Sequence, residues 1–74
     1  MREVWREDED ILLAEAVLRH IREGSTLMSA LDEVEKKLNR PAAECGFRWS
    51  AFVRHSYKNA INNAKKKREQ LISK

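Results

Sequence analysis

The sequence has little of what disulfides, tight turns and strands require. Among its 74 residues it contains one cysteine, one proline and two glycines. The single Cys45 cannot form an internal disulfide, and with only two histidines elsewhere it does not build a zinc site. Hairpins need glycine-containing turns and strands need β-branched residues, which are also sparse, so these shortages favour an all-α fold. We expect no metal and no cofactor, and a cytoplasmic location where thiols stay reduced.

Long apolar runs are also missing from the sequence. The longest is only a few residues, far short of a membrane span. The stretch 1–10 is charged and has no apolar run, unlike a signal peptide. A chain of this length forms one domain with a modest core. It shows no Ser/His/Asp set, no glycine-rich phosphate loop and no plausible pair of catalytic carboxylates, so we expect no catalytic residues and no enzyme activity.

The charge of the chain is divided unevenly between its two halves. Residues 1–39 hold 6 Lys/Arg and 10 Asp/Glu, whereas residues 40–74 hold 9 Lys/Arg and 2 Asp/Glu. The formal net charge of +3 therefore conceals an acidic first half and a strongly basic second half. A basic half on an otherwise acidic domain indicates a polyanionic partner. A solvated basic tail is the alternative interpretation.

Two helices are expected before the proline. The first spans about 7–23, because acidic residues fill its first turn and apolar residues recur at helical spacing, and Gly24 is a natural stop. The second begins after a cap at Ser25 or Thr26 and continues to about residue 38. Its predicted buried stripe consists of Leu27, Leu31, Val34 and Leu38.

A third helix is expected over 41–53, because proline is favoured at a first helical position. Gly46 within it costs roughly 1 kcal/mol relative to Ala and allows a neighbouring backbone to approach closely. The predicted apolar stripe of this helix consists of Ala42, Cys45, Trp49, Phe52 and Val53. A weak break near 54–56 precedes a fourth, basic helix. We expect that helix to lean on the domain near its start and to fray or pair with another chain near its end.

Three short helices with a tight second turn make a helix-turn-helix arrangement, whose last helix enters the major groove of DNA. In this chain the last helix of the trio begins the basic half. The expected fold and the charge therefore agree on double-stranded DNA as the partner.

These residues resemble a Myb repeat. Trp5 is followed by the acidic triplet 8–10 and by Leu13, as in the tryptophan, acidic triplet and leucine that open such repeats. Further matching positions are Leu31, Val34, Leu38, Glu44, Cys45, Arg48 and Trp49. The resemblance runs from Trp5 to Val53 and implies that both tryptophans belong to the core.

A closer resemblance is to the prespore-specific, Myb-like (RsfA-type) transcriptional regulators of spore-forming bacilli. Segments 12–24 and 43–49 look like that family's signature, and the match continues through 57–58 into the lysine-rich tail. It implies a Myb/SANT-like three-helix DNA-binding domain at 4–54 and a basic helical extension at 55–74, the start of a dimerising coiled coil. It further implies a sporulation regulator at the bacterial nucleoid. Members are usually longer, which makes this chain a fragment or a short member.

The residues expected to face DNA lie on the third helix and beyond it. They are Arg40, Phe47, Arg48, Ser50, Arg54, Lys58, Lys65 and Lys66. Arg40, Arg54 and Lys58 are assigned to phosphates, because their half of the chain offers few acids to pair with. Phosphate contacts position a domain but carry no sequence information.

Two of these residues have a second interpretation. Arg48 either contacts phosphate or guanine, or pairs with Asp10 or Glu9 of the first helix. Phe47 either touches a thymine methyl group or packs on the start of the fourth helix. Gly46, Phe47 and Ser50 stand where Myb repeats commonly reach bases, so the resemblance predicts DNA binding better than it predicts how sequence is read.

A SANT-like protein-interaction module without sequence-specific DNA binding is the rival function. SANT domains share the fold and tend to be acidic on the third-helix face. The sign of the net charge on the third and fourth helices discriminates between the two functions, and this net charge is positive here. His20 and His55 lie on different predicted helices, so they do not form a metal site.

Overall fold

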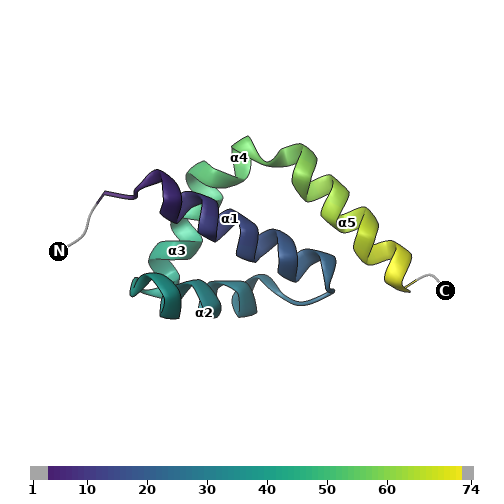
Figure 1. The fold of residues 1–74 in the computed structure, drawn as a ribbon, viewed down its shortest axis with the longest axis horizontal. Coiled ribbons are helices and arrows are strands. Elements are labelled where there is room, and N and C mark those ends of the chain that lie inside the picture. Colours follow the sequence, from purple (N-terminus) through teal and green to yellow (C-terminus); the bar gives the residue numbers. More distant parts are fainter. Residues whose placement is uncertain (1–3, 73–74) are drawn as a thin grey trace.

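The computed structural model describes residues 4–72 and is all-helical over that range, with no strand (Figure 1). The elements are α1 (Glu7–Arg22), α2 (Leu27–Leu38), α3 (Ala42–Arg48), the π-helical segment η1 (Trp49–Val53), α4 (Arg54–Ser56) and α5 (Lys58–Ile72). Because α3, η1 and α4 follow one another without a break, they form one continuous helix, called the third helix below. The predicted all-α class is confirmed.

The turns lie where the sequence breaks predicted them. Gly24 has a positive φ of 78°, which ends α1, and Asn39 adopts the left-handed conformation that ends α2. Of the two candidate caps of α2, it is Thr26 that accepts a hydrogen bond from the Ser29 amide, at 3.1 Å. Pro41 precedes the third helix as its capping residue and is not its first helical residue.

The core lies between α1, α2 and the third helix. Its buried residues are Leu13, Ala14, Ala16, Val17, Ala30, Leu31, Val34, Cys45, Trp49 and Val53. Trp5 packs against this cluster from the chain's start. The predicted burial of Leu27 is wrong: it lies at the first residue of α2, one turn before that helix meets the core, and Ala30 begins the buried stripe instead.

Gly46 lets α3 come close to α2. A Cβ atom at this position would lie 3.2 Å from Leu31 Cδ1, tighter than ordinary van der Waals contact. The close neighbour is therefore a side chain and not the backbone that the sequence led us to expect. The missing side chain still allows the third helix to seat on the buried stripe of α2.

After the third helix the chain changes direction, and α5 packs alongside α1. The change of direction occurs at Tyr57, whose φ of −121° departs from helical values. From there Tyr57 and Ile61 pack against the core and Ala64 is buried, as expected for a fourth helix that leans on the domain near its start. Figure 1 shows α5 reaching the C-terminal end of α1.

A polar cluster joins α1 to α2 on the other side. The Glu33 carboxylate accepts hydrogen bonds from Arg19, from His20 Nε2 at 2.8 Å and from Lys37 Nζ at 2.9 Å. His20 Nδ1 also lies 3.0 Å from Ser25 Oγ. The hydrogen bonds, that from Arg19 first, hold the pKa of Glu33 far below its ordinary value. The ionised carboxylate therefore ties the two helices together.

This cluster predicts an acid-sensitive link between α1 and α2. Because the pKa of Glu33 is lowered by folding, its contribution to stability is present above the ordinary carboxyl pKa of about 4.3 and is lost as the pH falls below it. Urea denaturation at several pH values should find Glu33→Gln less stable than the parent at neutral pH. That difference should narrow in acid. Asp32→Asn, at an exposed position of α2, is the control, and an equal narrowing in it would contradict the assignment.

Candidate nucleic-acid interface

Arg40 lies inside the fold. Its side chain is 2 % exposed, and its guanidinium donates to Glu9 Oε1 at 3.2 Å and to Glu44 Oε2 at 2.8 Å. It also donates to the Val4 carbonyl at 2.8 Å and lies 4.3 Å from the centre of the Trp5 ring. An arginine held in this way cannot reach a phosphate without unfolding its own site. The phosphate contact expected for Arg40 does not fit its burial.

Arg48 pairs with the first helix, as one of its two interpretations predicted. Its Nε and Nη2 atoms donate to the two carboxylate oxygens of Asp10 at 2.9 and 2.8 Å. Such a two-pronged bond uses the planar geometry of both groups and raises the pKa of Arg48. The guanidinium also lies 5.9 Å from the Trp5 ring centre and 4.8 Å from that of Phe52. Arg48 thus fixes the third helix against α1.

Arg40 and Arg48 both contact the ring of Trp5. Both guanidiniums lie within about 6 Å of its ring, the range in which a cation is attracted to an aromatic face. Each guanidinium is in turn held by a carboxylate from the first turn of α1, Glu9 for one and Asp10 for the other. The acidic triplet therefore serves cohesion between α1 and the third helix, beyond its effect on the helix dipole.

The surface of the third helix includes two aromatic rings beside polar side chains. Phe47, Ser50, Phe52 and Arg54 are exposed. The packing of Phe47 on the start of the next helix, one of its two interpretations, does not occur; its ring instead meets that of Phe52. The predicted burial of Phe52 is wrong, because the π-helical turn of η1 moves it off the buried stripe.

Arg54, Lys58 and Lys65 gather around one shallow hollow. It has a volume of about 300 Å³ and is completed by Ile61 and Asn62. Lys58, Ile61, Asn62 and Lys65 fall three or four residues apart and share one side of α5, and Arg54 of α4 completes the lining. Three of the predicted phosphate-binding cations are thereby brought together, and we call this the cationic hollow. Lys66 is exposed on α5 outside its lining.

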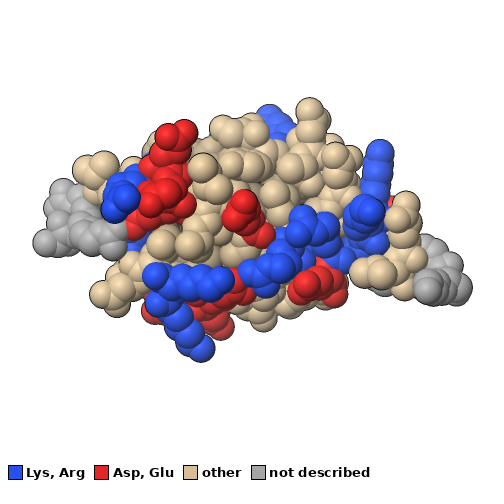
Figure 2. Space-filling view, in the orientation of Figure 1, with Lys and Arg blue, Asp and Glu red and all other residues tan. Residues whose placement is uncertain are grey.

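The chain around the cationic hollow contains no acid. From Cys45 to Arg68 the sequence has seven Lys or Arg and neither Asp nor Glu. On the face drawn in Figure 2, acidic side chains gather over the start of α1, while Lys and Arg form a band over α2, the end of α1 and α5, with further acidic side chains along its lower edge. An excess of positive charge along one stretch of chain creates a field that attracts a polyanion.

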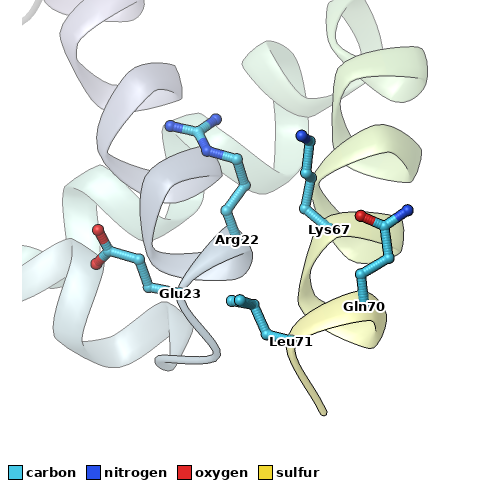
Figure 3. Close-up of a pocket in the computed structure, with 5 residues that line it drawn as sticks. All are labelled: Arg22, Glu23, Lys67, Gln70 and Leu71. Carbon is cyan, nitrogen blue, oxygen red and sulfur yellow. The ribbon is translucent and has the colours of Figure 1, made fainter. Parts of the chain in front are cut away.

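A second hollow lies where α1 and α5 converge. Figure 3 shows its lining: Leu71 of α5 points toward the end of α1, Arg22 and Lys67 stand on either side of the gap, Gln70 lies on α5, and the Glu23 side chain points away from α5. Its volume is about 650 Å³, larger than that of the cationic hollow. Its lining includes an acidic residue beside two cations and no residue of the third helix, so it is less suited to a polyanion.

Residues that would suit other chemistry are occupied or buried. Cys45 is buried, and burial raises the pKa of its thiol, which leaves it in the poorly reactive protonated form. Within residues 4–72, no group of three or more His, Cys, Asp or Glu is placed to hold a metal ion. None of the helices in that range is long and apolar enough to cross a membrane.

Sequence reasoning missed Phe52, Asn62 and Ile61 as surface or hollow residues. Ile61 and Asn62 could have been found, because they lie three and four residues after Lys58 and so share its side of a helix. Phe52 could not, because regular helical spacing assigns it to the buried stripe and nothing in the local sequence announces a π-turn.

The chain is thus a small helical protein whose acids hold the third helix in place and whose second half offers a cationic face. Over 70 residues it is 56 % identical to the sporulation-specific transcriptional regulator GerR of Bacillus subtilis (strain 168), a match that covers 95 % of this chain and 36 % of that protein. The predicted resemblance is confirmed: the chain is a relative of a sporulation-specific transcriptional regulator, which is not an enzyme. It spans about a third of that relative's length. No family model and no solved structure matches it.

Replacing Arg40 should be strongly destabilising. Arg40→Met leaves the buried Glu9 carboxylate without this partner, and breaking a buried pair in this way costs about 3–5 kcal/mol. Thermal unfolding followed by circular dichroism would measure the loss. Lys36→Ala, at an exposed position of α2, is the control and should stay within about 0.5 kcal/mol of the parent. A fully stable Arg40→Met variant would contradict the buried clamp.

The Arg48–Asp10 pair should show energetic coupling. Both side chains are about one-quarter exposed, so we expect a coupling free energy of about 1 kcal/mol in a double-mutant cycle of Arg48→Met and Asp10→Asn. Urea denaturation of the four proteins would measure it. A second cycle pairs Arg48→Met with Glu15→Gln, an exposed position of α1, and should be additive. Additivity in both cycles would exclude a role for Asp10 in holding Arg48.

Proposed function

We propose that this chain binds double-stranded DNA through a Myb/SANT-like helix-turn-helix, as the DNA-binding part of a bacterial transcriptional regulator of sporulation. The domain covers about 4–54, and residues 55–74 form its basic extension. The observation that carries the proposal is the cationic hollow, which continues the exposed side of the third helix within a stretch free of acids. The similarity to a sporulation-specific transcriptional regulator supports the regulatory role.

In the proposed complex the third helix lies in the major groove. Phe47 and Ser50 face the base edges, where sequence is read. Arg54, Lys58 and Lys65 bind phosphates from the cationic hollow, and Lys66 adds charge beside it. Ionic contacts of this kind orient the duplex and supply most of the affinity for DNA of any sequence.

Arg40 and Arg48 act indirectly in this proposal. Arg40 is buried and Arg48 is bonded to Asp10, so both hold the third helix at a fixed angle to α1. A helix whose orientation is set before binding loses less entropy when it docks. The two arginines therefore belong to the support of the interface.

A single domain of this size reads few base pairs, and we propose that two chains pair through α5 to double the site. Leu71 near the end of α5 is exposed and offers an apolar position for such pairing. The proposal also implies a cytoplasmic chain at the bacterial nucleoid, where its DNA lies.

The rival function is a SANT-like module that binds protein and not DNA. Its expected mark is an acidic third-helix surface. The cations around the cationic hollow and the run from Cys45 to Arg68 without an acid favour DNA over that alternative.

Binding to random duplex DNA over a series of salt concentrations tests the proposal. The affinity of the parent should fall steeply with salt, and Arg54→Ala and Lys58→Ala should each weaken binding and reduce the slope of log K against log salt by about 0.9. Lys36→Ala removes a cation from α2, outside the interface, and should leave the slope unchanged. Fluorescence anisotropy would measure all four proteins.

Two results would contradict the proposal. Absence of DNA binding by the parent at low salt would favour the protein-interaction function. A slope lowered as much by Lys36→Ala as by Arg54→Ala would mean that charge acts without a defined interface.

A further inference from the structure

Two phenylalanine rings lie side by side on the surface of the third helix. Phe47 is 68 % and Phe52 54 % exposed. Their ring centres are 6.3 Å apart and the planes meet at 74°, the edge-to-face geometry that aromatic pairs prefer. A domain this small needs its large apolar side chains for the core, so a pair left in water indicates a surface that meets something apolar.

The π-turn of η1 makes this pair. In a regular α-helix, residues five apart are separated by about 140° around the axis, so Phe52 would lie far from Phe47. A π-turn takes up an additional residue and brings residues five apart onto nearly the same side. The turn runs from Trp49 to Val53 and so includes Phe52, whereas Phe47 lies in α3 before it. It keeps Trp49 and Val53 buried while it moves Phe52 outward.

The pair is held in position and is not a loose surface cluster. The Arg48 guanidinium lies 4.8 Å from the centre of the Phe52 ring, close enough for a cation–π interaction. Asp10 holds that guanidinium with two hydrogen bonds. Through this chain of contacts α1 fixes the Phe52 ring, and Phe52 in turn supports Phe47.

The basic residues near the two rings in the sequence favour a partner that is negatively charged and also presents an apolar group. The acid-free run from Cys45 to Arg68 includes both rings, and Arg54 follows two residues after Phe52. In the major groove of DNA the C5 methyl of thymine is the apolar group presented among hydrogen-bonding base edges. A protein partner would need an acidic surface around an apolar knob, whereas thymine in duplex DNA supplies both features at once.

We infer that Phe47 and Phe52 form a thymine-methyl reader, and that this pair gives the third helix its preference for T·A base pairs. The inference rests on the proposed DNA binding and names what that interface reads. It assigns sequence selectivity to apolar contact with methyl groups, while the cationic hollow supplies affinity for any duplex.

Uracil substitution tests this directly, because it removes the methyl group and leaves every hydrogen-bonding atom of the base pair. Duplexes enriched by the protein from a random pool would be resynthesised with deoxyuridine in place of each thymidine in turn, and their dissociation constants compared. At the positions that face the pair, we expect each lost methyl to weaken binding about fourfold. At the other positions it should have no effect.

Variants connect the effect to the two rings. Phe47→Ala and Phe52→Ala should bind the thymine duplex more weakly and no longer distinguish it from the uracil form. Both positions are exposed, so the variants should fold, which circular dichroism would verify. Lys36→Ala, at an exposed position of α2 outside the interface, is the control that should keep the parent's sensitivity to the methyl group.

The outcomes separate this inference from the proposed function. Salt-dependent binding that is equal for thymine and uracil duplexes would overturn the methyl reader and leave DNA binding intact. A pool that is bound without enrichment of any sequence would overturn it as well, and so would methyl sensitivity that survives in Phe47→Ala and Phe52→Ala. Absence of binding to any duplex would overturn both.

Discussion

The fold depends on two carboxylates in the first turn of α1. Glu9 bonds to Arg40 just before the third helix, and Asp10 bonds to Arg48 within it. Both guanidiniums lie within about 6 Å of the centre of the Trp5 ring. Charge-assisted hydrogen bonds of fixed geometry add to the apolar packing and define the angle between α1 and the third helix. The orientation of the third helix is therefore fixed by two ion pairs with α1, one buried pair just before the helix and one partly exposed pair within it.

The ion pairs involve only some of the cations of the chain. Arg40 pairs with Glu9 and Glu44, Arg48 pairs with Asp10, and Glu33 joins Arg19, His20 and Lys37 in a cluster between α1 and α2. Arg54, Lys58 and Lys65 lie together around the cationic hollow, in a stretch of sequence without acids. Cohesion and proposed binding thus use different cations of one chain.

The sequence predicted the helices and turns well because those depend on local chemistry. Gly24, Thr26 and Asn39 act through their own backbone or the next turn, and periodic apolar residues defined the core. The pairing of Arg48 with Asp10 was one of two stated interpretations. The burial of Arg40 was missed because it depends on tertiary packing around Trp5, and local charge counting assigned the same residue to the surface. The π-turn was missed because buried apolar stripes are predicted on the assumption of regular α-helical spacing.

Phe52 was predicted to be buried and is exposed, and this difference is informative. A sequence that specifies one fold is consistent at every level, and departures from the local rule tend to occur where another requirement competes with packing. Burying Phe52 would require only a regular turn, whereas the observed π-turn exposes the ring and leaves its helix with longer-range hydrogen bonds. Trp49 and Val53 stay in the core on either side of it, so the turn does not reflect a poorly packed helix. The exposure of Phe52 beside Phe47 is better explained by a contact that this surface makes with a partner. The inferred reading of thymine methyl groups by the two rings supplies such a contact.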